Sequence, residues 1–523
     1  MKTTISILIS SLFLLFLSNC TVNNNEKKSD GNTGNLLVGW STQNITPDRT
    51  VLVAGQFPAR LSEGVLDSLT VTAMVLESKG ETSSERAIFV SCDIIGIKSE
   101  LLTAVQNQLK DLLPEIKPEE IILNATHTHT APLIGSETDS KSQYGIVLEA
   151  MSPTECLKYV SEKIALAVVN AWNGRKPGGI SYGLGHAVVG HNRLSVNLAG
   201  KSQMYGNTNK PDFSHMEGFE DHTVNLLYTW DDKSNLTGVV INVPCPSQVT
   251  ESLHQISADY WHETRLEVRE RLGKDIYILP QCGSAGDQSP HIRIGEKAEL
   301  RMQKMMFPDE TEIGDRTVAH RKQIAVRIAD AVMDVYPYVK DSIEWSPVVK
   351  NEMKVLDLSR RLISMSDVEN SIKEAKVWGE KYQQMLSEIE KNPEITKKDR
   401  WYYEITSTYT QARRGQSVKE RYELEKVQPE LPVQINVVRI GDIVIANNPF
   451  ELYLDYGERI KARSSATQTF IVQLSNGGYG YLPTSRSIAG GAYGAVPAST
   501  QVGPEGGQEL VDSTLQMIDE VMK

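Results

Sequence analysis

The stretch Glu120-Ile121-Ile122-Leu123-Asn124-Ala125-Thr126-His127-Thr128-His129-Thr130-Ala131-Pro132 decides the fold class. Residues 120–125 are mostly apolar and rich in β-forming side chains, which predicts a buried strand. The polar residues that follow stand at its carboxyl end, where open α/β sheets bind ligands. If the chain stays extended, His127 and His129 point to one side, about 7 Å apart. Two such imidazoles can share a metal ion, or one can bind the ion while the other transfers protons.

A simpler alternative for the two histidines is a structural role, in which they cap a loop by hydrogen bonding to backbone or threonine hydroxyl groups. The composition around them is that of a globular protein, because 40% of the 523 residues are hydrophobic and 23% are charged. The net charge of −12 and the lack of a basic cluster argue against nucleic acid as a partner. The scattered spacing of Cys92, Cys156, Cys245 and Cys282 indicates neither a zinc knuckle nor a disulfide scaffold.

The first 35 residues have the character of an export signal and a linker. Lys2 precedes the apolar run 5–17, which is too short to span a bilayer and is typical of a secretory signal. Leu17-Ser18-Asn19-Cys20 resembles the lipobox of bacterial lipoproteins, although Asn19 departs from the usual small residue. Residues 1–20 are therefore expected to be a lipoprotein signal peptide, and residues 21–35 a flexible tether. This predicts an exported protein anchored to a membrane through Cys20, in the periplasm or on the outer-membrane surface; without lipidation, the same segment predicts simple export.

Residues 36–523 alternate strand and helix patterns, which predicts an α/β domain with a mixed β-sheet core flanked by helices. Residues 364–427 are charged and strongly helix-forming, and are expected to be a helical insertion or lid. The strands are expected at 36–40, 69–76, 87–92, 121–124, 224–230, 238–243, 276–279 and 470–474, with a hairpin over 433–445 turned at Gly441-Asp442; the helices are expected at 99–113, 154–173, 260–272 and 451–464, with one more closing the chain.

Four further segments carry side chains suited to chemistry. Arg193 follows a strand-like stretch, and its planar fork suits a carboxylate, a phosphate or a developing oxyanion. Ser289 lies in the small-residue loop 281–291, Glu451 stands where a strand passes into a helix, and Tyr481 lies in the glycine-rich loop 475–484. A serine can attack or donate a hydrogen bond, and a phenol can bind metal or donate a proton. The alternatives are a surface salt bridge for Arg193, a capping acid for Glu451 and a packing lid for the tyrosines.

Taken together and in this order, these segments resemble the neutral ceramidase family, specifically its N-terminal catalytic domain. The matching landmarks are Val90-Ser91-Cys92-Asp93, Ala125-Thr126-His127-Thr128-His129, Asn192-Arg193, Ser257-Ala258-Asp259, Gly286-Asp287-Gln288-Ser289-Pro290, Pro449-x-Glu451 and Tyr481-Leu482-Pro483-Thr484. They extend from about Val38 to the end of the chain.

The resemblance implies an amide hydrolase that separates a fatty acid from a sphingoid base at one zinc ion. By position, the implied zinc ligands are His127, Glu451 and Tyr481. The implied catalytic residues are His129 for proton transfer, Arg193 for the oxyanion, Ser289, and Tyr493 in the following loop. Tyr479 and Tyr493 are alternatives to Tyr481 as the metal-binding phenol. Between Ser289 and water as the nucleophile, water is favoured, with Ser289 positioning the substrate.

The sequence departs from the family at two points. Pro246 takes the place of the second histidine ligand, and a proline side chain cannot bind metal. His129, Cys245, Gln248 or His254 are the candidates to complete the ligand shell; otherwise the site binds a different ion or none. The family's usual additional β-sandwich domain is also not expected here, which makes ceramide itself a doubtful substrate.

Three hypotheses follow. The leading one is an exported, membrane-tethered hydrolase that cleaves an amide bond, or an ester bond, of a lipid- or glycan-derived acyl substrate. The second is a surface lipoprotein that binds a glycan or a lipid without turnover. The third is a serine-type hydrolase that uses Ser289 with His129 as base and no zinc.

Overall fold

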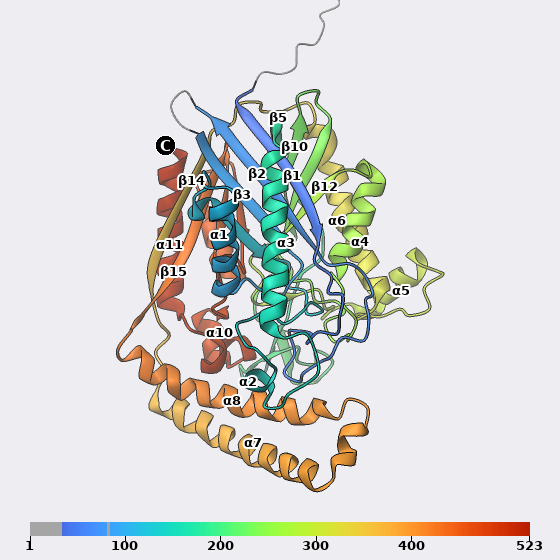
Figure 1. Cartoon of the computed structure of the whole chain (residues 1–523), viewed down its shortest axis with the longest axis vertical. Helices are drawn as coiled ribbons and strands as arrows, with labels where there is room; N and C mark the ends of the chain where they lie inside the picture. Colours follow the sequence, from blue (N-terminus) through green and yellow to red (C-terminus); the bar gives the residue numbers. More distant parts are fainter. Residues whose placement is uncertain (1–33, 81–83) are drawn as a thin grey trace, which may run out of the picture.

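The computed structural model describes residues 34–80 and 84–523 and has an eight-stranded sheet at its centre (Figure 1). Its strand order is β12-β11-β10-β5-β1-β2-β3-β4, with parallel pairing in β3–β4 and β11–β12 and antiparallel pairing elsewhere. The strands are β1 (Leu36–Asn44), β2 (Thr70–Lys79), β3 (Ser84–Cys92), β4 (Ile121–Ala125), β5 (Lys176–His186), β10 (Thr223–Asp231), β11 (Leu236–Val243) and β12 (Tyr277–Cys282). The predicted mixed α/β architecture is therefore confirmed.

Both faces of this sheet are buried, and the alternation of side chains along β2 shows how. Val71, Ala73 and Val75 face the core shared with helices α1 (Ser99–Leu112) and α3 (Pro153–Asn173). Met74 and Leu76 face the opposite side, where they join a core shared with a second sheet. Helices α4 (Tyr260–Leu272) and α6 (Val318–Val339) cover the β10–β12 part of the sheet.

The second sheet has the order β14-β15-β16-β18 and packs against the central sheet. It consists of β14 (Val349–Ser359), β15 (Glu430–Ile440), β16 (Ile443–Asn447) and β18 (Gln468–Val472). Helices α9 (Leu454–Arg463) and α11 (Pro504–Met522) bury their apolar sides against its outer face. The result is a four-layer arrangement of helices, sheet, sheet and helices (Figure 1).

A helical hairpin extends across one end of these layers (Figure 1). Helix α7 (Met365–Lys391) packs along α8 (Tyr402–Glu425), within the charged stretch 364–427. Ser364 begins α7 with a capping box, since its Oγ accepts the Asp367 backbone N–H and the Asp367 carboxylate accepts the Ser364 N–H. Thr406 of α8 fixes the hairpin to the body by accepting the Ala59 backbone N–H at 2.9 Å.

The amino-terminal signal and Cys20 lie outside the described residues, as does most of the expected tether. Within residues 34–80 and 84–523, no helix has the length and hydropathy needed to cross a bilayer. The four described cysteines are buried and not disulfide-bonded.

Candidate active site

Three parallel strand pairs, β3–β4, β11–β12 and β16–β18, have their carboxyl ends at the same end of the molecule. Direct contacts join these ends, because Ala125 N donates to Leu474 O at 3.2 Å and Gln473 N donates to Cys282 O at 3.0 Å. Below them, the Arg265 guanidinium of α4 forms two hydrogen bonds of 2.9 Å with the Asp93 carboxylate at the end of β3. The loops that leave these strands carry nearly all of the candidate residues.

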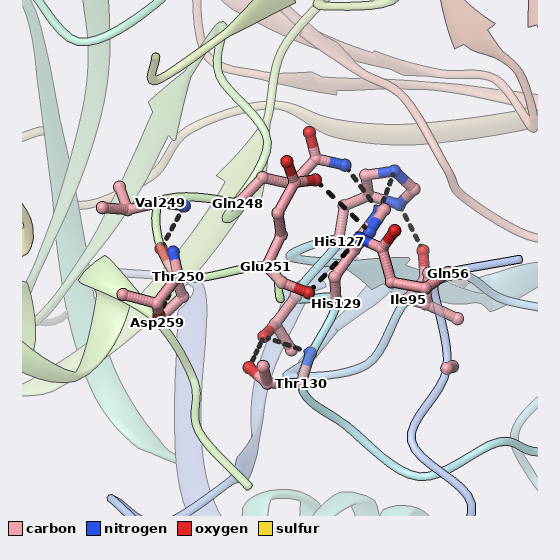
Figure 2. Close-up of polar contacts among 12 residues, drawn as sticks. Gln56, Ile95, His127, His129, Thr130, Gln248, Val249, Thr250, Glu251 and Asp259 are labelled. Carbon is pink, nitrogen blue, oxygen red and sulfur yellow. Dashed lines mark hydrogen bonds and ion pairs between the residues drawn. The ribbon is translucent and has the colours of Figure 1, made fainter. Parts of the chain in front are cut away.

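His127 lies two residues beyond β4, in a left-handed backbone conformation with φ of 65°. The expectation of an extended segment with imidazoles about 7 Å apart is therefore wrong. The left-handed turn instead brings the His127 and His129 ring centroids to 4.9 Å and their Nε2 atoms to 3.4 Å. The Ile95 carbonyl lies 2.5 Å from His127 Nδ1 and accepts its proton, which leaves Nε2 free to bind a metal (Figure 2).

Glu451 and Tyr481 are neighbours because short strands pair them directly. The expected helix over 451–464 begins only at Leu454, since Glu451 belongs to β17 (Glu451–Leu452). Strand β17 runs parallel to β19 (Tyr481–Leu482), with Glu451 opposite Tyr481. Glu451 Oε2 lies 3.7 Å from His127 Nε2. Burial raises the pKa of the Tyr481 phenol well above its ordinary value, and the Glu451 carboxylate raises it further.

Arg193 lies in the same cluster and is almost completely buried. Its Nη2 atom donates to Gly286 O at 2.8 Å and to Tyr481 Oη at 3.3 Å, and lies 3.8 Å from Glu451 Oε2. Its Nη1 atom donates to Tyr205 Oη at 3.1 Å. Burial alone lowers the pKa of Arg193, but the neighbouring Tyr205, Tyr481 and Glu451 hold that pKa well above its ordinary value.

His129 faces the same centre through its Nε2 atom, which lies 2.5 Å from Gln248 Nε2 (Figure 2). Burial lowers the pKa of His129 well below its ordinary value, and the nearby His127 ring lowers it further. The imidazole is therefore neutral at physiological pH and able to accept a proton.

The donor atoms present fit one metal ion held by His127, Glu451 and Tyr481. The separation of 3.7 Å between His127 Nε2 and Glu451 Oε2 suits two ligands of one ion with bonds of about 2.0–2.2 Å. The third donor is a phenol, and no group of three His, Cys, Asp or Glu side chains with metal-binding geometry occurs in the described part of the chain. Zinc therefore stays a prediction that rests on this mixed set of donors.

Of the candidates to replace the missing histidine at Pro246, only two reach the cluster: His129, and Gln248, whose Oε1 lies 3.5 Å from Arg193 Nη1. Cys245 is buried, with its Sγ donating to Pro246 O at 3.5 Å. His254 points elsewhere, toward Leu61 O at 3.2 Å and Glu63 at 3.3 Å.

Ser289 and Tyr493 lie beside this centre rather than within it. Ser289 is buried on β13 (Gln288–Ser289), and its Oγ accepts the His291 backbone N–H at 3.4 Å. Among the hydrogen bonds of the described residues, none joins Ser289 Oγ to an imidazole, which the serine-type alternative would need. Tyr493 is 38% exposed, and its ring centroid lies 6.0 Å from that of Tyr481.

Three residues of the site were not expected from the sequence: Tyr205, Glu251 and Gly55. Tyr205 binds Arg193, and Glu251 Oε2 lies 3.7 Å from His129 Nδ1. A Cβ on Gly55 would lie 2.5 Å from the His129 ring. None belongs to a recognisable motif, although a glycine two residues after the isolated bridges of 51–53 is a weak signal of close packing.

Comparisons with known proteins agree with this architecture. No protein-family model matches the sequence, and no curated protein matches it significantly. The crystal structure of neutral ceramidase from Pseudomonas aeruginosa matches with a TM-score of 0.63 and 16% identity, over 93% of this chain and 75% of that one. A structure of ceramidase complexed with C2 matches with a TM-score of 0.61 and 15% identity, over 92% of this chain and 74% of that one. The chain therefore has the fold of neutral ceramidase, as the landmarks in its sequence imply.

Proposed function

We propose that this protein is a hydrolase that cleaves the amide bond between an acyl group and an amine. The observation that carries the proposal is the convergence of four residues that are widely separated in the chain. His127 lies 3.7 Å from Glu451, Glu451 lies 3.8 Å from Arg193, and Arg193 lies 3.3 Å from Tyr481. The fold shared with neutral ceramidase supports the same reaction class.

The chemistry requires charge stabilisation and proton transfer at one carbonyl group. His127, Glu451 and Tyr481 would hold the zinc ion, whose chemistry when bound would be to lower the pKa of water at the site to about 7 and to polarise the carbonyl. Arg193 presents guanidinium N–H groups to the oxyanion that develops on the carbonyl oxygen. His129, neutral by burial, accepts a proton from the attacking water at Nε2 and returns it to the leaving amine.

The proposed substrate is an N-acyl compound with a lipid-like acyl chain, presented at a membrane surface. The support is the ceramidase-like fold together with the export signal predicted for residues 1–20 and the lipobox-like Leu17–Cys20. Export and anchoring are tested separately by labelling cells with a radioactive fatty acid and comparing the wild type with Cys20→Ser. Label that depends on Cys20 supports the anchor, and equal label in both argues against it.

The reaction itself is tested with purified protein and two substrates that share one fatty acid, an N-acyl sphingoid base and the corresponding O-acyl ester. We expect fatty acid release from the amide, about one equivalent of zinc per chain, and loss of activity on chelation that zinc restores. Release from the ester alone would reassign the protein as an esterase. Amide release that chelation leaves unchanged would support the serine-type alternative with Ser289.

A further inference from the structure

Glu251 is a partly buried carboxylate that points at the far side of the His129 ring from the proposed metal position. Its side chain and that of His129 are each 12% exposed, and Glu251 Oε2 lies 3.7 Å from His129 Nδ1 (Figure 2). A separation of 3.7 Å is slightly longer than a hydrogen bond, so a small side-chain rotation is enough to form one. Glu251 follows β11 in an irregular segment, eight residues before Asp259, the residue that caps helix α4.

Positive groups fix this carboxylate from its other side. Glu251 Oε1 accepts from Arg316 Nη1 at 2.7 Å and from His291 Nε2 at 3.2 Å. His291 is fully buried, and its Nδ1 lies 3.1 Å from Asp315 Oδ2. Burial tends to raise the pKa of Glu251, but the hydrogen bonds from His291 and Arg316 hold that pKa far below its ordinary value. Because a buried charge is costly unless it is paired, these contacts keep Glu251 ionised and in place.

The hydrogen bonds around His129 determine which of its nitrogens carries the proton. Arg193 can only donate, so the Gln248 amide must direct its oxygen toward Arg193 Nη1, at 3.5 Å. The Gln248 NH₂ group then faces His129 Nε2 at 2.5 Å and donates to it. His129 therefore accepts at Nε2 and carries its proton on Nδ1, which is the atom that faces Glu251.

We propose that Glu251 is the positioning residue of His129: it holds the imidazole with its proton on Nδ1 and thereby keeps Nε2, on the side of the catalytic centre, as the unprotonated acceptor nitrogen. The His291–Asp315 pair and Arg316 fix Glu251 in turn. The kinetic consequence rests on the proposed amide hydrolysis, whereas the effect on the His129 tautomer does not depend on it.

The test compares Glu251→Gln with the wild type and with Glu63→Gln. Glu63 is a matched control, because it also contacts an imidazole (His254, 3.3 Å) and an arginine (Arg400, 2.8 Å), but it is 45% exposed and remote from the cluster. The tautomer is measured by NMR of ¹⁵N-histidine-labelled protein, with the His129 signals assigned from His129→Gln. Circular dichroism and thermal unfolding establish that each variant is folded, and kcat and KM are measured on the N-acyl substrate.

We expect the Nδ1–H tautomer of His129 in the wild type and in Glu63→Gln, and a shift toward Nε2–H in Glu251→Gln. Replacing the carboxylate of such a pair by an amide lowers kcat by up to about 10⁴-fold in a serine protease. At this longer contact we expect kcat to fall by about 10²-fold with KM within about twofold. An unchanged tautomer in Glu251→Gln overturns the proposal, as does an unchanged kcat in an active enzyme. A shifted tautomer in a protein that hydrolyses no N-acyl substrate would retain the positioning role and reject the proposed function.

Discussion

Gly55 shows how closely the backbone approaches the candidate base. A Cβ at this position would lie 2.5 Å from His129 Cγ and 2.6 Å from His129 Nδ1, and the backbone φ of +103° is unfavourable for any other residue. We predict that Gly55→Ala displaces the imidazole, lowers kcat by at least about tenfold and destabilises the fold by about 1–3 kcal/mol through backbone strain.

Gly64 provides the matched control for this substitution. Its φ of +126° imposes a similar backbone strain, but a Cβ there would meet no atom within 4 Å. Gly64→Ala should therefore lose stability in urea unfolding and keep the kcat of the wild type. Equal kcat values in the two variants would contradict a requirement for close packing at His129.

Asp287 is a second residue whose burial has a measurable consequence. Its Oδ1 accepts the Leu454 backbone N–H at 2.8 Å, and burial raises its pKa from the ordinary 3.8 to about 6. Between these values the folded state keeps a proton that the unfolded state has lost. The stabilising contribution is therefore complete below about pH 4 and is lost as the pH rises through 6, with an upper limit of about 3 kcal/mol.

We predict that the free energy of unfolding of the wild type falls more steeply between pH 4 and 6 than that of Asp287→Asn. Urea unfolding at four pH values across this range measures the difference. Asp330→Asn is the control, since Asp330 is a surface residue paired with Arg271 and should give the wild-type slope. Parallel curves for the wild type and Asp287→Asn would exclude the raised pKa.

Among the helices and strands, the ones that the sequence could predict are those with a clear apolar periodicity. Helix Tyr260–Leu272 has the predicted boundaries, and the turn at Gly441-Asp442 joins β15 to β16 as expected. Strand β14 was not expected, because it is an edge strand with mostly half-exposed residues and therefore has a weak alternation. The start of α9 was misplaced, because Glu451 and Leu452 form ladder hydrogen bonds with a segment 30 residues further along the chain, which no local pattern reports.

The residues of the candidate site also divide into those that a local sequence pattern indicates and those that only tertiary folding brings together. Four candidate residues follow a strand-like pattern or lie in a distinctive loop, so the sequence could indicate them: His127, Arg193, Glu451 and Tyr481. Glu251 lies in an irregular segment, and only tertiary folding brings it to His129. The left-handed turn at His127 was also missed, because a positive φ is uncommon for any non-glycine residue and the enrichment of histidine there is too weak to predict one turn.

The hairpin of α7 and α8 reaches the rim of the site through Arg414. The Arg414 guanidinium of α8 lies 4.5 Å from the ring centroid of Tyr493 and donates to Ser499 Oγ. Tyr493 in turn contacts Tyr481, so Arg414 connects the hairpin to the rim of the catalytic centre.

We predict that Arg414→Ala raises KM severalfold, because the cation–π contact that holds Tyr493 at the rim is worth about 0.5–1 kcal/mol and orders the substrate entrance. The value of kcat should stay within about twofold, since no reacting group is removed. Arg413→Ala is the control, because Arg413 is directed to Ser142 O, away from Tyr493. A large fall in kcat for Arg414→Ala, or equal KM values in both variants, would argue against this role.

At the scale of the whole molecule, the four-layer arrangement explains why the site draws on such distant parts of the sequence. The central sheet supplies His127 and His129 after β4 and Gln248 after β11, and the segments around the second sheet supply Glu451 and Tyr481. The carboxyl ends of the parallel pairs of both sheets lie together, so neither sheet alone can form the cluster. We propose that these two halves form one reaction centre for acyl-amide cleavage.

The most direct test is fatty acid release from an N-acyl lipid amide by the wild type, His127→Ala and Glu451→Gln, measured in parallel with His254→Ala as the control. His254 is a similarly buried imidazole whose contacts are Leu61 and Glu63. We predict turnover by the wild type and His254→Ala, and a loss of at least about 10³-fold in each of the other two variants. Undiminished turnover in either His127→Ala or Glu451→Gln would contradict a single centre built from both sheets.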